Sequence, residues 1–281
     1  MGTHTIRKLA AASILAFAAS ASHAAMENAW TYNLTLNWLP GTAVFNNVDA
    51  NGRPTNSQGG YYADQYLLSW GALNGNYMNP TADPGNNRSG LVIDNSPATG
   101  TIDTNGASVS ANMFTHYNAP IWSNLPDLNK VQMAVSVTLT SLDGSAMFKL
   151  DRTFEVFFKE TVNDGQQCAW GLCDDDIFAI VSIDPKLNDL SSSFTLDGWE
   201  YTFNYFETSS HLKPLASAAC EAAGIAAGRA CYGFTTPESM NTLVQFGFSV
   251  TAVPEPQTYA MLLAGLGMIG VVARRRRNAL Q

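Results

Sequence analysis

Strict alternation of apolar and polar residues is the feature that most constrains how this chain folds. From Trp30 to Trp38 every second residue is a large apolar one, and the residues between them are Thr or Asn. The same period of two recurs from Val131 to Leu139. Successive side chains of a β-strand point to opposite faces, so both segments are predicted to be strands with one face buried.

Turn signals separate about ten such segments. Asp143-Gly144 and Asp197-Gly198 each stand between apolar runs, as hairpin turns do. Segments 154–158 and 177–183 are apolar at nearly every position, which is typical of strands covered on both faces. The only helical candidate before the C-terminal segment is 215–230, which is Ala-rich but contains two glycines. We therefore expect an all-β fold, an antiparallel β-sandwich resembling a jelly roll.

Polar loops are expected between these strands. Pro40-Gly41 is predicted to end the first strand, and 46–60 and 73–88 are rich in Gly, Asn and other polar residues. Binding residues are often carried by loops of this kind.

The last 29 residues, 253–281, have a different character. Pro254, Glu255 and Pro256 precede an apolar run of 16 residues, 258–273, and four arginines follow it: Arg274, Arg275, Arg276 and Arg277. Arginines are retained on the cytoplasmic side while an apolar run lies in lipid, so the pattern indicates a stop-transfer segment, a single hydrophobic transmembrane helix. The run is shorter than a comfortable span and contains three glycines, which favours a temporary anchor.

This tail resembles the PEP-CTERM sorting signal of Gram-negative bacteria in the order and spacing of its three parts. The resemblance implies recognition by an exosortase, a membrane transpeptidase that would cut near Pro-Glu-Pro. The upstream protein would then remain at the cell surface or in an extracellular matrix. The alternative is a simple single-span anchor with a fortuitous pair of prolines.

The N-terminus agrees with export. Arg7 and Lys8 precede the short apolar run 9–19, and Ser22-His23-Ala24 supplies the small residues that a signal peptidase requires. Residues 1–24 are therefore predicted to be a secretory signal peptide that is removed. Residues 25–252 are then expected to form one β-sandwich ectodomain.

The ectodomain is strongly acidic. It contains nine Lys and Arg against 22 Asp and Glu, a net charge near −13, once both terminal signals are left out. Binding of nucleic acid depends on clustered cations, so nucleic acid is not an expected partner. The acidity favours a soluble exterior and suits divalent cations.

Four cysteines in an exported chain predict two disulfides, since the periplasm is oxidising. Of the three connectivities, the spacing favours Cys168–Cys173 and Cys220–Cys231. A zinc site is the competing interpretation, but neither pair has CxxC spacing and His211 is the one histidine nearby.

A second resemblance concerns Thr115, His116, Tyr117 and Asn118, which are similar to the signature of the THxN family of PEP-CTERM proteins. Further landmarks of that family recur between this motif and the tail: Glu160-Thr161-Val162-Asn163, Cys168 to Asp174 leading into Asp176-Ile177-Phe178, and Cys231 to Phe234 followed by Thr235-Thr236-Pro237-Glu238.

His116 is the obvious candidate for catalysis because histidine titrates near neutral pH. A single His between Thr and Asn is more often a structural residue that fixes a loop by hydrogen bonds, and we predict that role. The sequence contains neither a Gly-x-Ser-x-Gly elbow nor a His-Glu-x-x-His pair. No catalytic residue is therefore assigned, and the protein is not expected to be an enzyme.

Asp174, Asp175 and Asp176 are a weak candidate for Ca²⁺, which takes six to eight oxygen ligands. Consecutive residues of a strand point to opposite faces, so these acids would have to lie in a loop to converge. A solvated acidic turn is the simpler interpretation. No other metal or cofactor is expected. Carboxylate pairs for a glycosidase could be drawn from Glu155 with Glu160, or Asp174 with Glu200.

Aromatic residues in or beside polar loops are the better functional lead. Tyr61, Tyr62, Tyr77 and Trp122 have this position. Exposed aromatic faces bind sugar rings, whereas the alternative is packing in the core, which we favour for Trp122.

Together these features predict an exported, exosortase-processed surface or extracellular-matrix protein without enzymatic activity. Exosortase and the inner membrane are the expected partners during sorting, and the resemblance implies association with exopolysaccharide or a biofilm. Two alternatives remain: a carbohydrate-binding, lectin-like module, and an extracellular glycan hydrolase.

Overall fold

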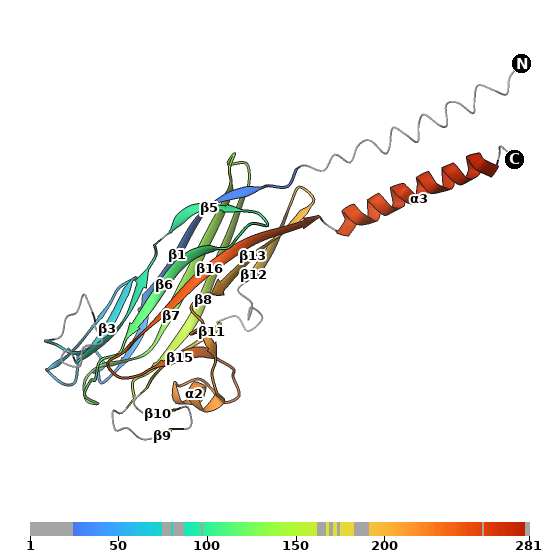
Figure 1. Cartoon of the computed structure of the whole chain (residues 1–281). Coiled ribbons are helices and arrows are strands. Elements are labelled where there is room, and N and C mark those ends of the chain that lie inside the picture. Colours follow the sequence, from blue (N-terminus) through green and yellow to red (C-terminus); the bar gives the residue numbers. More distant parts are fainter. Residues whose placement is uncertain are drawn as a thin grey trace, which may run out of the picture.

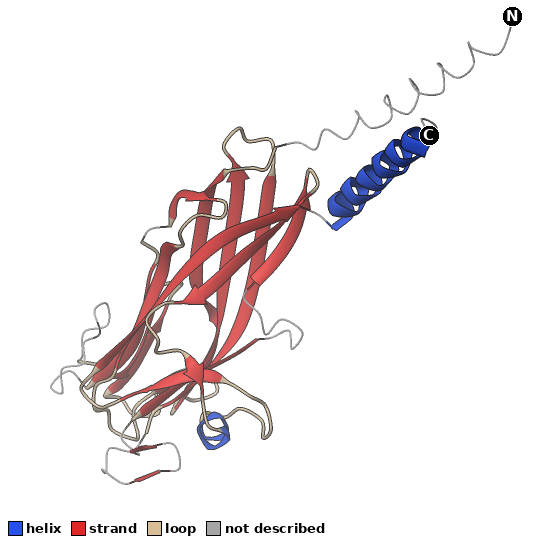
Figure 2. Cartoon of the chain, turned by 45° about the vertical axis from the view of Figure 1, so that its right-hand side comes forward, coloured by secondary structure: helices blue, strands red, loops and turns tan. Residues whose placement is uncertain are grey.

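Two antiparallel sheets of seven strands each pack face to face (Figures 1 and 2). The computed structural model describes residues 25–74, 80, 87–96, 98–161, 167–168, 171–172, 175–182, 191–254 and 256–278. Every pairing within the two sheets is antiparallel. The predicted all-β sandwich is confirmed.

The first sheet has the strand order β14-β15-β11-β8-β7-β1-β5. Its strands are β14 (Lys213–Pro214), β15 (Tyr232–Thr236), β11 (Asp176–Ser182), β8 (Met147–Lys159), β7 (Asp127–Ser141), β1 (Ala29–Asn46) and β5 (Thr99–Asp103).

The second sheet has the order β12-β13-β16-β6-β4-β3-β2. Its strands are β12 (Ser191–Leu196), β13 (Trp199–Glu207), β16 (Asn241–Pro254), β6 (Val109–Tyr117), β4 (Arg88–Asp94), β3 (Leu67–Ala72) and β2 (Gly59–Ala63). A separate ribbon pairs β9 (Gln167–Cys168) with β10 (Gly171–Leu172), and the helices among the described residues are α2 (Ser217–Ala222) and α3 (Pro256–Asn278).

The core lies between the sheets and follows the predicted alternation. On β1 the inward side chains are buried and include Trp30, Leu34 and Trp38, while the residues between them are partly or fully exposed. β7 shows the same pattern along its length. The Asp197-Gly198 turn is also confirmed, because both residues have the positive φ that a type I′ hairpin requires.

The first strand is longer than predicted. β1 continues through Pro40-Gly41 to Asn46, and its pairing with β7 shifts register between Leu39 and Val44. The hydroxyl of Thr42 accepts a bond from the Gln132 N–H at 2.9 Å and donates to the Leu39 carbonyl at 2.6 Å. A side chain thus replaces the ladder bonds that are lost at this irregularity, so the strand continues instead of ending.

Strand β11 is covered on both faces, as its apolar sequence predicted. Phe178 and Ile180 point into the main core. Ile177, Ala179 and Val181 face a smaller cluster, whose other buried members are Cys220, Ala223, Ile225 and Cys231. The segment around α2 therefore packs on the outer face of the first sheet.

The helix in this segment is much shorter than the predicted 215–230. It spans Ser217–Ala222, and Gly224 follows it with a φ of 96°. A left-handed glycine just after a helix is the usual way in which a helix ends. Gly228 also has a positive φ, so the chain cannot resume the helix there.

The predicted Cys220–Cys231 disulfide is confirmed, with a Cα–Cα distance of 5.9 Å. It closes the small cluster over β11, since both cysteines are buried there. The Cys168–Cys173 pairing lies outside the described residues, because neither side chain is among them, and it stays a prediction.

The predicted C-terminal helix forms as α3, and it projects from the sandwich beyond the end of β16 (Figures 1 and 2). Its apolar side chains are exposed, as at Leu263, Met268 and Ile269. Among the described residues, no helix combines the length and the apolar character needed to cross a membrane, so the transmembrane helix is not confirmed. The apolar run of 16 residues is shorter than the roughly 20 that such a span requires.

Replacing both Cys220 and Cys231 with Ser should lower the free energy of unfolding by roughly 2 to 3 kcal/mol, because the unfolded chain regains the entropy of an open loop. Urea unfolding of the purified protein measures this loss. Peptide mapping without reductant should recover the two cysteines in one cross-linked fragment. Cross-linking of either one to Cys168 or Cys173 would contradict the assignment.

Candidate functional site

A cluster of polar side chains lies between the two sheets. Glu160 directly follows β8, Asp176 begins β11 and Glu238 lies two residues after β15. The antiparallel order β15-β11-β8 places these three positions at the same end of three neighbouring strands of the first sheet. One oxygen from each carboxylate lies within 4.8 Å of the others. His116 reaches the cluster from β6 of the second sheet.

The imidazole of His116 is held in a fixed orientation and has no exposed surface. Its Nδ1 lies 2.9 Å from Oγ1 of Thr236, and that hydroxyl donates to Oγ1 of Thr242, also at 2.9 Å. Since the Thr236 hydroxyl already donates, it accepts from Nδ1–H, and the lone pair is left on Nε2. Nε2 lies 3.9 Å from Oδ2 of Asp176.

Asn118 binds the same segment as His116. Its Nδ2 donates to the carbonyl of Thr236 at 2.8 Å, and its backbone N–H donates to the carbonyl of Met240. His116 and Asn118 are two residues apart in extended chain, so both side chains point to one face. The motif thus joins β6 to the end of β15 by bonds to both the side chain and the backbone of Thr236, and to the segment before β16 by the bond to Met240.

Hydrogen-bond donors of the protein orient one oxygen in each of two carboxylates, Glu160 and Asp176. The indole Nε1 of Trp70 donates to Oε2 of Glu160 at 3.0 Å. The backbone N–H of Thr161 donates to Oδ1 of Asp176 at 2.9 Å. The ring of Phe158 packs edge-on against His116, and Trp70 stacks parallel to it at a centroid distance of 6.3 Å.

Burial dominates the electrostatics of the cluster. It raises the pKa of Glu160 well above its ordinary value, and the nearby charges of Asp176 and Glu238 raise it further. Burial likewise raises the pKa of Asp176, although the N–H of Thr161 opposes this. Burial lowers the pKa of His116 to about 3, so the imidazole is neutral at physiological pH.

The structure divides the acidic run proposed for Ca²⁺. Asp176 joins Glu160 and Glu238, Asp175 is outside this cluster of carboxylates, and Asp174 lies outside the described residues. The sequence analysis named Glu160 and Glu238 as landmarks of a resemblance, and Glu160 also as half of a candidate glycosidase pair, but it did not group them as ligands. Strand pairing brings them together, since Asp176 is opposite Thr236 and Ile177 is opposite Lys159.

The glycosidase pairs drawn from the sequence are not brought together among the described residues. Glu155 points elsewhere on β8 and forms an ion pair with Arg229 at 3.8 Å. Glu200 belongs to β13 of the other sheet, and Asp174 is not described.

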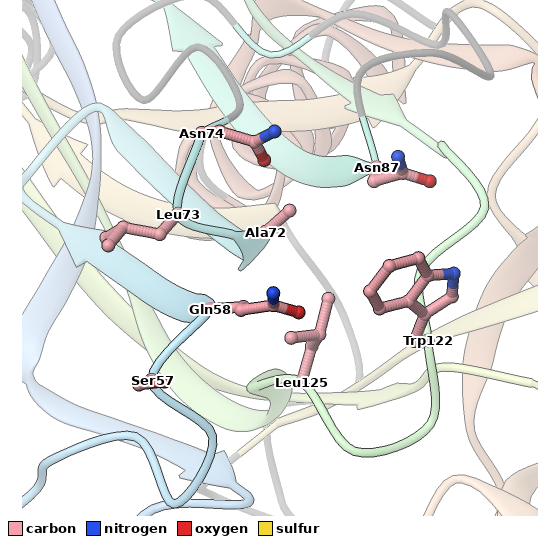
Figure 3. A pocket seen from close by; sticks show the side chains of 8 residues that line it. All are labelled: Ser57, Gln58, Ala72, Leu73, Asn74, Asn87, Trp122 and Leu125. Carbon is pink, nitrogen blue, oxygen red and sulfur yellow. The ribbon is translucent and has the colours of Figure 1, made fainter.

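A surface pocket of about 540 Å³ is the second candidate site. Figure 3 shows the indole of Trp122 beside the same opening as the amide side chains of Gln58, Asn74 and Asn87. Ser57, Ala72, Leu73 and Leu125 complete the lining. The pocket thus combines a flat aromatic face with several groups that can both donate and accept hydrogen bonds.

The prediction that Trp122 packs in the core is wrong, because 60% of its side chain is exposed. Ile121 and Leu125 occupy the buried positions of this loop, and Trp122 is directed outward between them. Tyr61 is half-buried, stacks on Phe45 and donates to the carbonyl of Gly52. Tyr62 donates to Asp64, and Tyr77 lies outside the described residues.

Comparison with known proteins identifies the tail. Residues 252–277 match the PEP-CTERM protein-sorting motif, which confirms the sorting signal predicted from the sequence. The motif is recognised by exosortase and marks the chain as an exported protein. No curated protein sequence was found to match the chain. The signal peptide at 1–24, which lies outside the described residues, and membership of the THxN family stay predictions.

Replacing His116 with Ala should lower the free energy of unfolding by about 1 to 3 kcal/mol, because the buried Thr236 hydroxyl loses its donor. The exposed His211 provides a matched control, and its replacement with Ala should change stability by less than about 0.5 kcal/mol. Urea unfolding of both variants at neutral pH measures the difference. Equal effects of the two replacements would contradict a structural role for the network.

Proposed function

We propose that this chain, exported and sorted through the motif at 252–277, is a non-enzymatic surface or extracellular-matrix protein of a Gram-negative bacterium that associates with exopolysaccharide. The observation that carries the association with glycan is the exposed indole of Trp122 in a pocket lined by amide side chains. The destination rests on the sorting motif.

The junction between sandwich and tail suits proteolytic removal of the tail. β16 ends at Pro254 and α3 begins at Pro256, so the Pro-Glu-Pro sequence lies between the last strand and the helix. The described side chains of α3 from residue 263 onward are largely exposed and contribute nothing to the core of the sandwich. Cleavage at the junction would therefore release α3 and leave the ectodomain folded. Until then, α3 is proposed to act as a transient anchor in the inner membrane.

The Trp122 pocket has the chemistry that sugar rings require. A pyranose offers a face of C–H groups, which packs on an aromatic ring, and a rim of hydroxyls, which bind amide groups. Exposed large apolar side chains surrounded by polar groups commonly mark binding sites. The acidic ectodomain would favour neutral sugars over acidic ones because like charges repel.

The same pocket also supports the alternative of a lectin-like module, which would recognise one defined glycan instead of a matrix polymer. The glycan hydrolase is the weaker alternative. The carboxylates of Glu160 and Asp176 lie close together, but Asp176 has no exposed surface, and a polymer chain would have to reach it between the sheets. This burial supports the non-enzymatic proposal.

Protein released from the native host should be processed at both ends. Intact-mass measurement should place its N-terminus near Ala25 and its C-terminus within Pro254 to Pro256, because the signal peptide and the sorting tail are both removed. Recovery of Arg274 to Gln281 on mature surface protein would refute processing by exosortase.

Replacing Trp122 with Ala should weaken binding to the host's exopolysaccharide at least about fivefold, since loss of a central aromatic anchor usually costs more than 1 kcal/mol. Tyr232 on β15 is a matched control, because it is a similarly exposed aromatic residue, at 49%, that does not line the pocket. Its replacement with Ala should leave affinity unchanged. Sedimentation with the purified polysaccharide measures both.

The same assay separates the alternatives. Release of reducing sugar from the polysaccharide would support a hydrolase and overturn the non-enzymatic proposal. Binding to one member of a glycan array without binding to the polymer would favour the lectin-like module. An equal loss of binding in the Trp122 and Tyr232 variants would remove the pocket from the proposal.

A further inference from the structure

Two hydrogen-bond acceptors face each other in the interior of the sandwich. Nε2 of His116 carries a lone pair because Nδ1 donates to Thr236, and it points toward Oδ2 of Asp176 at 3.9 Å. Both atoms are buried, and neither has a hydrogen-bond partner among the described residues. A lone pair beside a carboxylate oxygen is unfavourable unless a proton or a cation lies between them.

The neighbouring carboxylates extend this arrangement. Oε1 of Glu160 is also buried without a hydrogen-bond partner among the described residues, and the Glu238 carboxylate lies within 4.8 Å of the other two. Trp70 and Thr161 hold the opposite oxygens of Glu160 and Asp176. Each of these two acids therefore has one oxygen fixed by Trp70 or Thr161, and the two carboxyls also lie within hydrogen-bond reach of each other. Metal ligands are oriented by neighbouring donors in the same manner.

A proton shared between the neighbouring carboxyls of Glu160 and Asp176 would lower the charge of the cluster but would leave Nε2 of His116 without a partner. An O–H···N hydrogen bond requires a separation near 2.7 to 3.0 Å, roughly 1 Å shorter than that between Asp176 Oδ2 and His116 Nε2. Two ligands about 2.0 to 2.2 Å from one ion are separated by roughly 3 to 4 Å, which matches. One divalent ion would also neutralise two negative charges and satisfy several acceptors at once, whereas one proton neutralises one charge.

We propose that His116, Glu160, Asp176 and Glu238 bind a divalent transition-metal ion, with Zn²⁺ as the representative, in a buried structural site between the two sheets. The imidazole favours a transition metal over Ca²⁺, which takes oxygen ligands in larger number. Four protein ligands are typical of structural and not catalytic zinc. The site differs from the Ca²⁺ candidate of the sequence in its metal and in all its ligands except Asp176.

Such an ion would act as a clamp between the sheets. His116 belongs to β6 of the second sheet, and the three acids lie at the ends of β8, β11 and β15 of the first. The ion would therefore join segments that are up to 122 residues apart in the chain, between His116 and Glu238. Metal binding that stabilises the native state alone raises the melting temperature as the free metal concentration rises.

The test uses the full-length protein, stripped of metal with EDTA and dialysed. Addition of Zn²⁺ should restore about one tightly bound ion per chain by elemental analysis and raise the melting temperature by about 5 to 10 °C at saturation. Co²⁺ in place of Zn²⁺ should give the visible absorption of a nitrogen- and oxygen-ligated ion. Ca²⁺ at the same concentration should produce neither effect.

Variants identify the ligands. Asp176→Asn keeps the acceptor for the Thr161 N–H and loses the negative charge, so it should abolish the bound ion and the shift in melting temperature. Glu238→Gln is a second, less buried replacement with the same expected loss, in case Asp176→Asn does not fold. His211→Ala and Glu200→Gln, both outside the cluster, should retain the full response.

Two results would overturn the proposal. One is wild-type protein that neither retains Zn²⁺ nor gains thermal stability from it, which would indicate that a shared proton stabilises the cluster. The other is a response that persists undiminished in Asp176→Asn and Glu238→Gln but is lost in His211→Ala, which would indicate binding at the surface. A shift with Ca²⁺ and none with Zn²⁺ would likewise contradict the assignment of the metal.

Discussion

The interior shared by the two sheets is largely apolar, so any polar group that enters it must bring its own partners. This constraint explains the dense bonding around His116. Its Nδ1 is hydrogen-bonded to the hydroxyl of Thr236, which donates to Thr242. Asn118 donates to the backbone carbonyl of Thr236. Partners are incomplete at the face of His116 toward Asp176 and Glu160, where three buried acceptor atoms have no hydrogen-bond partner among the described residues. Polar groups retained at such a cost usually serve a specific purpose.

The sequence predicted most of the fold because its long strands bury one face. β1 and β7 alternate strictly, and the apolar stretch of β11 indicated cover on both sides, which the segment around α2 provides. The edge strand β5 carried no such signal. It has a single buried residue in five and so lacks the alternation that predicts a half-buried strand. Likewise, nothing local shows that the Thr42 hydroxyl replaces ladder bonds and carries β1 past a proline.

The candidate metal site could not be predicted from the sequence, for a different reason. Glu160 and Glu238 each stand beside turn residues, and an acid in that position is normally solvated. They converge because β8, β11 and β15 are neighbours in the sheet, and neighbour relations between distant strands are not encoded by period or composition. Trp122 is the opposite case, an apolar residue that was predicted to be buried and is exposed. It lies between the buried residues Ile121 and Leu125, but only one face of an irregular loop can be buried.

The position of β16 links the fold to sorting. It is the last strand of the chain, yet it lies inside the second sheet between β13 and β6, and it supplies buried side chains including Val244, Phe248 and Val250. The second sheet cannot be completed until this strand has been added. The sorting motif begins at the end of the same strand. A cut upstream of Pro254 would remove part of the pairing with β13, which extends to Pro254 opposite Trp199, whereas a cut beyond it spares the ladder. Pro254 is therefore the earliest point at which the tail can be removed without loss of strand pairing in the second sheet.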